Sequence, residues 1–96
     1  MPNYIFQEIE RLHAEWSRME KAAKLGWLAG EKIRLNRMMY QLSQYIHLKG
    51  GFSNNEERAY ARKLLEMAEG IDVEGSKVWN DLADDAFKEI VKSLMR

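Results

Sequence analysis

The residues best suited to chemistry in this sequence are Glu10 and His13, which form a Glu-x-x-His pair. On a helix this spacing places a carboxylate and an imidazole on adjacent turns, as in carboxylate-bridged di-metal bundles. Such a site needs a second pair and two more inward carboxylates, but the only other histidine, His47, follows Gln44 by three residues. The chain also lacks cysteine, and with it the thiolate ligands of zinc. We therefore expect no metal ion and no organic cofactor, and we interpret Glu10 and His13 as a surface pair.

Arginines are the second group that could do chemistry. Convergent Arg and Lys side chains can stabilise an anionic transition state without other catalytic groups. The comparable set here consists of Arg34, Arg37, Arg58 and Arg62. Two of these four fall on the outer side of their predicted helix, and the sequence has no Ser–His–Asp grouping and no glycine-rich phosphate loop. We therefore expect no catalytic residues and a protein that is not an enzyme.

Charge is spread unevenly along the chain, although the formal net charge is zero. Residues 1–20 carry two Lys and Arg against four Glu, residues 21–63 carry nine against three, and residues 64–96 carry four against eight Asp and Glu. A basic middle segment can contact phosphate groups, so nucleic-acid binding through residues 21–63 is the alternative function. Glu56 and Glu57 near the start of a predicted helix, and an isoelectric point of about 6.7, count against it.

The stretch from Leu28 to Lys49 has apolar groups on two sides when it is drawn as a helix with about 100° per residue. The first side is an ordinary core face, which consists of Leu28, Leu35, Met38, Met39, Leu42, Tyr45 and Ile46. The opposite side carries a narrower line in which Ile33, Tyr40 and His47 are spaced by seven residues. A helix of this kind either lies between neighbours or offers its second side to a partner.

We predict that this second side binds another protein, with Tyr40 as the buried anchor. The predicted partner-binding residues are Ile33, Arg34, Arg37, Tyr40, Gln41, Gln44 and His47. Aromatic residues, methionine and arginine are enriched at the centres of protein interfaces. Several apolar residues fall outside the predicted core faces, namely Phe6, Trp27, Tyr40, Val78 and Met95. If Tyr40 belonged to the core instead, the second line would explain the fold and say nothing about function.

Four helices must position these residues, and the pattern predicts them near 4–25, 28–49, 54–69 and 76–95. Asn3 is the expected cap of the first, whose narrow apolar face consists of Ile5, Ile9, Leu12, Trp16, Met19 and Ala23. After Ala23 the apolar residues no longer continue the helical spacing of this face. This change predicts a break within Gly26–Gly30, although one long bent helix remains an alternative.

Glycines and capping residues mark the later boundaries. Gly50 and Gly51 end the second helix, and Ser53 with Glu56 forms a capping box for the third. The expected core side of the third helix consists of Tyr60, Ala61, Leu64, Met67 and Ala68. Gly70 closes this helix, and Ser76 is the expected N-cap of the last, although Asp72 is an alternative start.

These elements predict an all-α fold: a compact antiparallel bundle of about four helices, with a hairpin of two longer helices plus two more, in a single helical domain spanning 1–96. No apolar run approaches the ~20 residues that span a bilayer. No signal-peptide core follows Met1. We therefore expect a cytoplasmic protein that does not contact a membrane.

The expected function is that of a small non-catalytic protein–protein interaction module, acting as a regulator, inhibitor or adaptor of a larger protein. Small helical phage-encoded inhibitors, bacterial immunity proteins and antitoxin-like regulators share this size and look, which is an analogy of class. A homodimer is a further expectation. Two copies would pair through Ile9, Leu12, Trp16 and Met19 if the helical hairpin leaves that face open.

Overall fold

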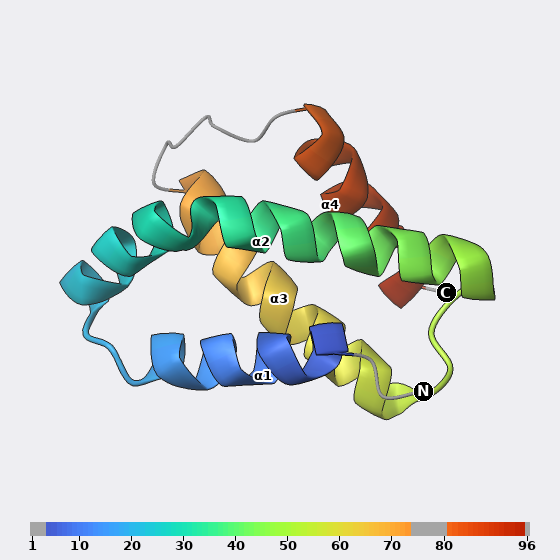
Figure 1. Cartoon of the computed structure of the whole chain (residues 1–96), viewed down its shortest axis with the longest axis horizontal. Coiled ribbons are helices and arrows are strands. Elements are labelled where there is room, and N and C mark those ends of the chain that lie inside the picture. Colours follow the sequence, from blue (N-terminus) through green and yellow to red (C-terminus); the bar gives the residue numbers. More distant parts are fainter. Residues whose placement is uncertain (1–3, 74–80, 96) are drawn as a thin grey trace.

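The structure is a computed structural model that describes residues 4–73 and 81–95, with side chains at 4–69 and 85–95. It contains four helices: α1 (Tyr4–Ser17), α2 (Lys21–Lys49), α3 (Asn55–Val73) and α4 (Asp81–Leu94) (Figure 1). The described residues form no strand, so the all-α prediction is confirmed. No helix within them is long and apolar enough to cross a membrane.

α2 is the longest described helix and, like α3, contacts the three others (Figure 1). It crosses the middle of the view, and α1 runs below it in the opposite direction. Six of the seven residues predicted for its core face are buried, and Tyr45 is half-buried. The periodicity of apolar residues in this helix therefore identified its inner side correctly.

The other helices bury one side each against this inner side and against one another. α1 buries Ile9 and Leu12 almost completely, and α3 buries Leu64 and Met67 in the same way. The apolar face of α1 is thus buried against other helices of the same chain. It is therefore not available for the homodimer expected through Ile9, Leu12, Trp16 and Met19. Phe6, predicted to lie outside the core, is also buried. Its ring centroid lies 5.5 Å from that of Tyr45, in an edge-to-face arrangement.

The turn between α1 and α2 lies at residues 18–20, so the predicted break within Gly26–Gly30 is wrong. α1 ends at Ser17, whose Oγ donates a hydrogen bond to the carbonyl oxygen of Ala14 at 3.1 Å. Glu20 then takes an extended conformation before α2 begins, and its side chain forms no capping bond. Both glycines lie inside α2, at a cost of about 1 kcal/mol each relative to alanine.

Contacts between the end of α1 and the start of α2 explain why the helix continues through these glycines. Trp27 Nε1 donates a hydrogen bond to Glu15 Oε1 at 3.0 Å, and the Lys24 ammonium lies 4.3 Å from the centroid of the Trp16 ring. Leu28 is buried one residue beyond Trp27. These packing interactions favour a regular helix over the extra turn that glycine would permit.

The boundary between α2 and α3 is close to the prediction. Gly50 caps α2 in the left-handed conformation (φ 77°), and its amide donates to the carbonyl oxygen of Ile46 at 2.8 Å. The capping box of α3 is shifted by one residue from the predicted Ser53 and Glu56. The Glu57 amide donates to Asn54 Oδ1 at 2.9 Å, and Glu57 Oε1 accepts from the Ser53 amide at 2.7 Å. Asn54 caps the helix because it accepts this bond as well as a serine would.

The last boundaries differ more. α3 continues through Gly70 to Val73, so its predicted end at Glu69 is wrong. A glycine inside a helix costs only about 1 kcal/mol, which the buried side chains earlier in α3 offset. α4 is described from Asp81. The predicted cap at Ser76 therefore lies outside the described residues, and the side chains of Leu82 and Ala83 lie outside them as well.

Leu35→Ala should lower the free energy of unfolding by about 2–5 kcal/mol, because the Leu35 side chain is fully buried and its removal leaves a cavity. Leu48→Ala is the matched control on the same helix. Its side chain is 86% exposed, so the change should stay within about 0.5 kcal/mol. Urea denaturation followed by circular dichroism measures both. Equal losses in the two variants would contradict the assignment of the inner side of α2.

Candidate functional site

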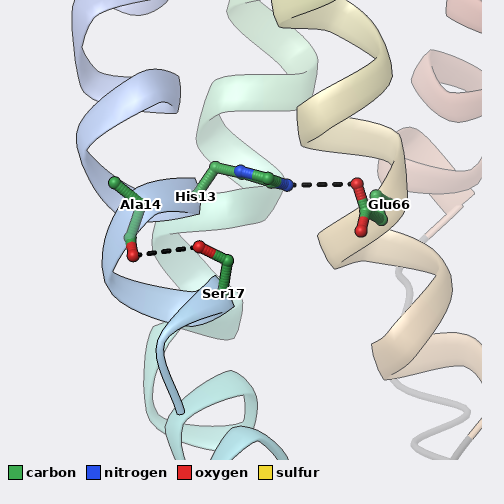
Figure 2. A network of polar contacts seen from close by, with 4 residues as sticks. All are labelled: His13, Ala14, Ser17 and Glu66. Carbon is green, nitrogen blue, oxygen red and sulfur yellow. Dashed lines mark hydrogen bonds and ion pairs between the residues drawn. The ribbon is translucent and has the colours of Figure 1, made fainter.

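Glu10 and His13 attach α1 to α3. His13 Nε2 lies 3.0 Å from Glu66 Oε2, and Figure 2 shows the two side chains pointing toward one another from α1 and α3. The Tyr60 hydroxyl donates to Glu10 Oε2 at 3.3 Å. The interpretation of Glu10 and His13 as a pair is therefore wrong, because each has a separate partner on α3. Within the described residues no three His, Cys, Asp or Glu are placed to hold a metal ion.

The four arginines serve different local contacts. Arg34 Nε lies 3.2 Å from Glu31 Oε2 and 4.0 Å from Glu8 Oε1, which links α2 to α1. Arg58 donates to Asn55 Oδ1 at 3.0 Å on its own helix. Arg37 and Arg62 are exposed. The described contacts bring no two of these guanidinium groups together, so they do not form the convergent set that anion stabilisation needs.

Several lysines of the basic middle segment lie over aromatic rings. The ammonium group of Lys49 lies 5.7 Å from the ring centroid of Tyr45, and that of Lys63 lies 5.5 Å from the ring centroid of Tyr60. Such cation–π contacts hold the long side chains against the chain's own surface. Lys49 lies on α2 and Lys63 lies on α3, so the lysines of residues 21–63 are spread over two helices.

The predicted partner-binding residues remain largely exposed on the side of α2 away from the core. The Ile33 side chain is 74% exposed and that of Tyr40 is 39% exposed. Arg37, Gln41, Gln44 and His47 are exposed as well, and Arg34 is half-buried. The Gln44 amide Nε2 donates a hydrogen bond to the Tyr40 hydroxyl at 2.7 Å. This bond restrains the tyrosine ring on the surface, one turn from Gln44.

Leu48 is 86% exposed beside His47, and it was not among the predicted partner-binding residues. The spacings of seven and eight residues from Ile33 to Tyr40 to Leu48 follow the two-turn repeat of a helix, and this signal could have identified it. Together these residues form a surface that we call the outer face of α2. It consists of Ile33, Arg34, Arg37, Tyr40, Gln41, Gln44, His47 and Leu48.

Two cavities lie where the C-terminal part of this face meets α4. One has a volume of about 350 Å³ and is lined by Ser43, Gln44, His47, Leu48 and Glu89. The other, of about 430 Å³, is lined by Ile46, His47, Gly50, Lys88, Glu89, Lys92 and Ser93. Both cavities share His47 and Glu89, and Nδ1 of the histidine lies 3.6 Å from Oε1 of the glutamate.

Glu89 is also the acceptor for the Ser43 hydroxyl, which donates to its Oε2 at 2.7 Å. The carboxylate therefore lies between serine and histidine. In a catalytic triad the histidine must lie between the other two, because it takes the proton from serine. The described contacts thus give Ser43 no histidine base, and the Ser43–Glu89–His47 group joins α2 to α4.

Tyr45 fixes the same end of α2 to α3. Its hydroxyl donates a hydrogen bond to Glu57 Oε2 at 2.6 Å. Burial raises the pKa of Tyr45 above its ordinary value, and the hydrogen bond to Glu57 raises this pKa further. The protonated hydroxyl of Tyr45 therefore holds the C-terminal end of α2, which carries Gln44, His47 and Leu48, against α3.

Comparison with known proteins gives no functional assignment. No family model, no curated protein and no solved structure matches this chain. Its function is therefore inferred from the surface that its own residues form.

Tyr45→Phe should reduce the loss of stability at alkaline pH. The raised pKa means that the unfolded chain releases the Tyr45 proton first, so stability falls as pH rises above about 10 toward the folded-state pKa. Phenylalanine removes this contribution and costs about 1 kcal/mol at neutral pH through the lost hydrogen bond. Urea denaturation at pH 7 to 11 measures the effect. Tyr4→Phe, at a 78% exposed side chain, is the control. Parallel pH profiles for wild type and Tyr45→Phe would contradict the assigned role.

Proposed function

We propose that this protein is a small non-catalytic protein–protein interaction module, which regulates, inhibits or bridges a larger protein through the outer face of α2. The observation that supports this proposal is the alignment of Ile33, Tyr40 and Leu48 on the exposed side of α2. Exposed apolar residues in a row are costly to maintain unless a partner covers them.

The distribution of exposed apolar side chains favours α2 over the rest of the surface. Single exposed apolar residues are ordinary and need no explanation. Within the part of the chain whose side chains are described, six large apolar side chains are exposed, and four of them lie on α2. They are Leu25, Ile33, Tyr40 and Leu48. The concentration on one helix supports a functional reason for their exposure.

The inner side of α2 cannot take up these residues, because it is already packed. Leu35 and Leu42 are fully buried, and all three other helices contact α2. An α-helix repeats every 3.6 residues, so turning the outer face inward would expose the core face by the same rotation. The inner side of α2 therefore serves folding, and the outer face of α2 serves binding.

Tyr40 has the properties of an interface anchor. Its ring is large, its hydroxyl is held by Gln44, and Arg37 lies one turn before it on the same side of the helix. Tyrosine and arginine are enriched among residues whose truncation costs about 2 kcal/mol or more of binding energy. A side chain already restrained before binding also loses less conformational entropy.

Affinity capture from a bacterial lysate, followed by mass spectrometry, tests the proposal. Ile33→Asp and Tyr40→Ala should each lose a protein that wild type retains, and the melting temperature should stay nearly unchanged because both side chains lie outside the core. Met95→Asp is the matched control, since Met95 is 82% exposed at the end of α4. It should capture the same protein as wild type.

Two results would contradict the proposal. The first is an identical set of captured proteins for wild type and all three variants. The second is a large loss of melting temperature in Tyr40→Ala, which would assign Tyr40 to the core.

A further inference from the structure

The outer face of α2 has charge of only one sign. Residues 21–49 contain six Lys and Arg and one acidic residue, Glu31. That glutamate lies 3.2 Å from Arg34 and is mostly covered. Arg37 lies in the middle of the face, and within the described residues no carboxylate lies within ion-pair distance of it. A partner that docks here therefore meets apolar groups beside Arg34 and Arg37, with the carboxylate of Glu89 at the edge of the face next to His47.

This charge disfavours a second copy of the same chain on the same face. A symmetric dimer would place the outer face of one protomer against the outer face of the other. Arg37 would then meet the cationic side of the second copy, where Glu31 and Glu89 already have partners in their own chain. Like charges brought together in this way cost several kcal/mol, which opposes self-association through this surface.

The shape of the same side of α2 favours a helix as the occupant. Ahead of Ile33, this side exposes small residues at Ala22, Gly26, Ala29 and Gly30, with the exposed Leu25 next to Ala22 and Ala29. A Cβ atom added at either glycine would meet nothing within 4 Å, so the surface there is open. Helix axes can approach to about 8 Å where the contacting side chains are small. α2 has 29 residues, which makes it the longest of the four described helices.

The C-terminal part of the outer face of α2 borders a cavity. The cavity of about 350 Å³ beside Gln44, His47 and Leu48 is large enough to receive an apolar side chain from a partner. Ile33 and Tyr40 project between this cavity and the small residues. A partner helix would thus lie close to α2 at one end and insert a large residue at the other.

Lipid and nucleic acid fit this surface less well. A helix that lies in a membrane interface presents large apolar residues along its whole length, whereas four of the residues named on this side are glycine or alanine. Phosphate contacts need hydrogen-bond donors, which this side supplies only from residue 33 onward, through Arg34, Arg37, Gln41 and Gln44. On α2 the cationic groups flank an apolar line. A partner helix whose carboxylates flank an apolar line of its own would match this pattern.

We propose that the outer face of α2 binds an acidic amphipathic helix of a partner protein. The partner's apolar residues pack on Ile33, Tyr40 and Leu48, and its Asp or Glu side chains pair with Arg37 and its cationic neighbours. This inference rests on the proposed function and specifies the chemistry of the partner.

Three synthetic helical peptides of equal length test the inference by isotope-edited NMR titration. The first has leucines at i, i+3, i+4 and i+7 flanked by glutamates. The second has lysines in place of the glutamates, and the third keeps the glutamates but has glutamine in place of the leucines. The first peptide should shift the amide signals of residues 33–48 and bind about tenfold more tightly than either of the others.

Charge-reversal variants complete the test with the first peptide. Arg37→Glu should weaken binding about tenfold, because it replaces attraction by repulsion at the centre of the face. Arg62→Glu, an exposed arginine on α3, is the matched control and should weaken binding less than about twofold. Circular dichroism verifies that both variants are folded.

Each contrary result has a defined meaning. Equal or tighter binding of the lysine peptide to residues 33–48 would overturn the acidic partner and leave the interaction function standing. No shift at residues 33–48 with the glutamate peptide would overturn the inference. Tighter binding of phosphatidylserine vesicles or of a DNA duplex to these residues would overturn both the inference and the proposed function.

Discussion

The packing of one side of α2 against the other three helices is the constraint on which the whole structure depends. α1 and α4 are each half as long as α2, and neither could bury its apolar residues alone. Leu35, Met39 and Leu42 lie where these packing surfaces meet, and all three are fully buried. Polar links at the margins then set the positions of the helices, through Ser43 and Glu89 for α4 and through Tyr45 and Glu57 for α3.

This arrangement leaves most of the opposite side of α2 open, because the described part of α4 meets only its C-terminal part. Three helices on one side of a fourth cannot also cover its back, so Ile33 and Leu48 stay in solvent as a direct consequence of the topology. The same links that hold the core also stiffen the exposed side. His47 contacts Glu89 and Gln44 holds Tyr40, so a partner would meet a surface whose geometry exists before binding.

The sequence predicted the parts of the fold that depend on local periodicity and failed where distant residues decide. The core face of α2 follows from apolar spacing, and the left-handed cap at Gly50 follows from glycine chemistry. The turn at residues 18–20 carries no glycine or proline, and the hydrogen bond between Trp27 and Glu15 joins the helices on its two sides. His13 finds its partner Glu66 at a separation of 53 residues, which no local pattern reveals. Exposure of Ile33 and Tyr40 was predictable, whereas the cavity beside Leu48 depends on α4.

The division of α2 into a buried side and an open side is the central claim, and solvent paramagnetic relaxation tests it most directly. An inert gadolinium chelate broadens the methyl signals of residues that solvent can reach. Strong broadening is expected at Ile33 and Leu48, and protection at Leu35 and Leu42, at every protein concentration. Protection of Ile33 and Leu48 equal to that of the core leucines in dilute protein would contradict this expectation, because the chain would then cover this surface itself.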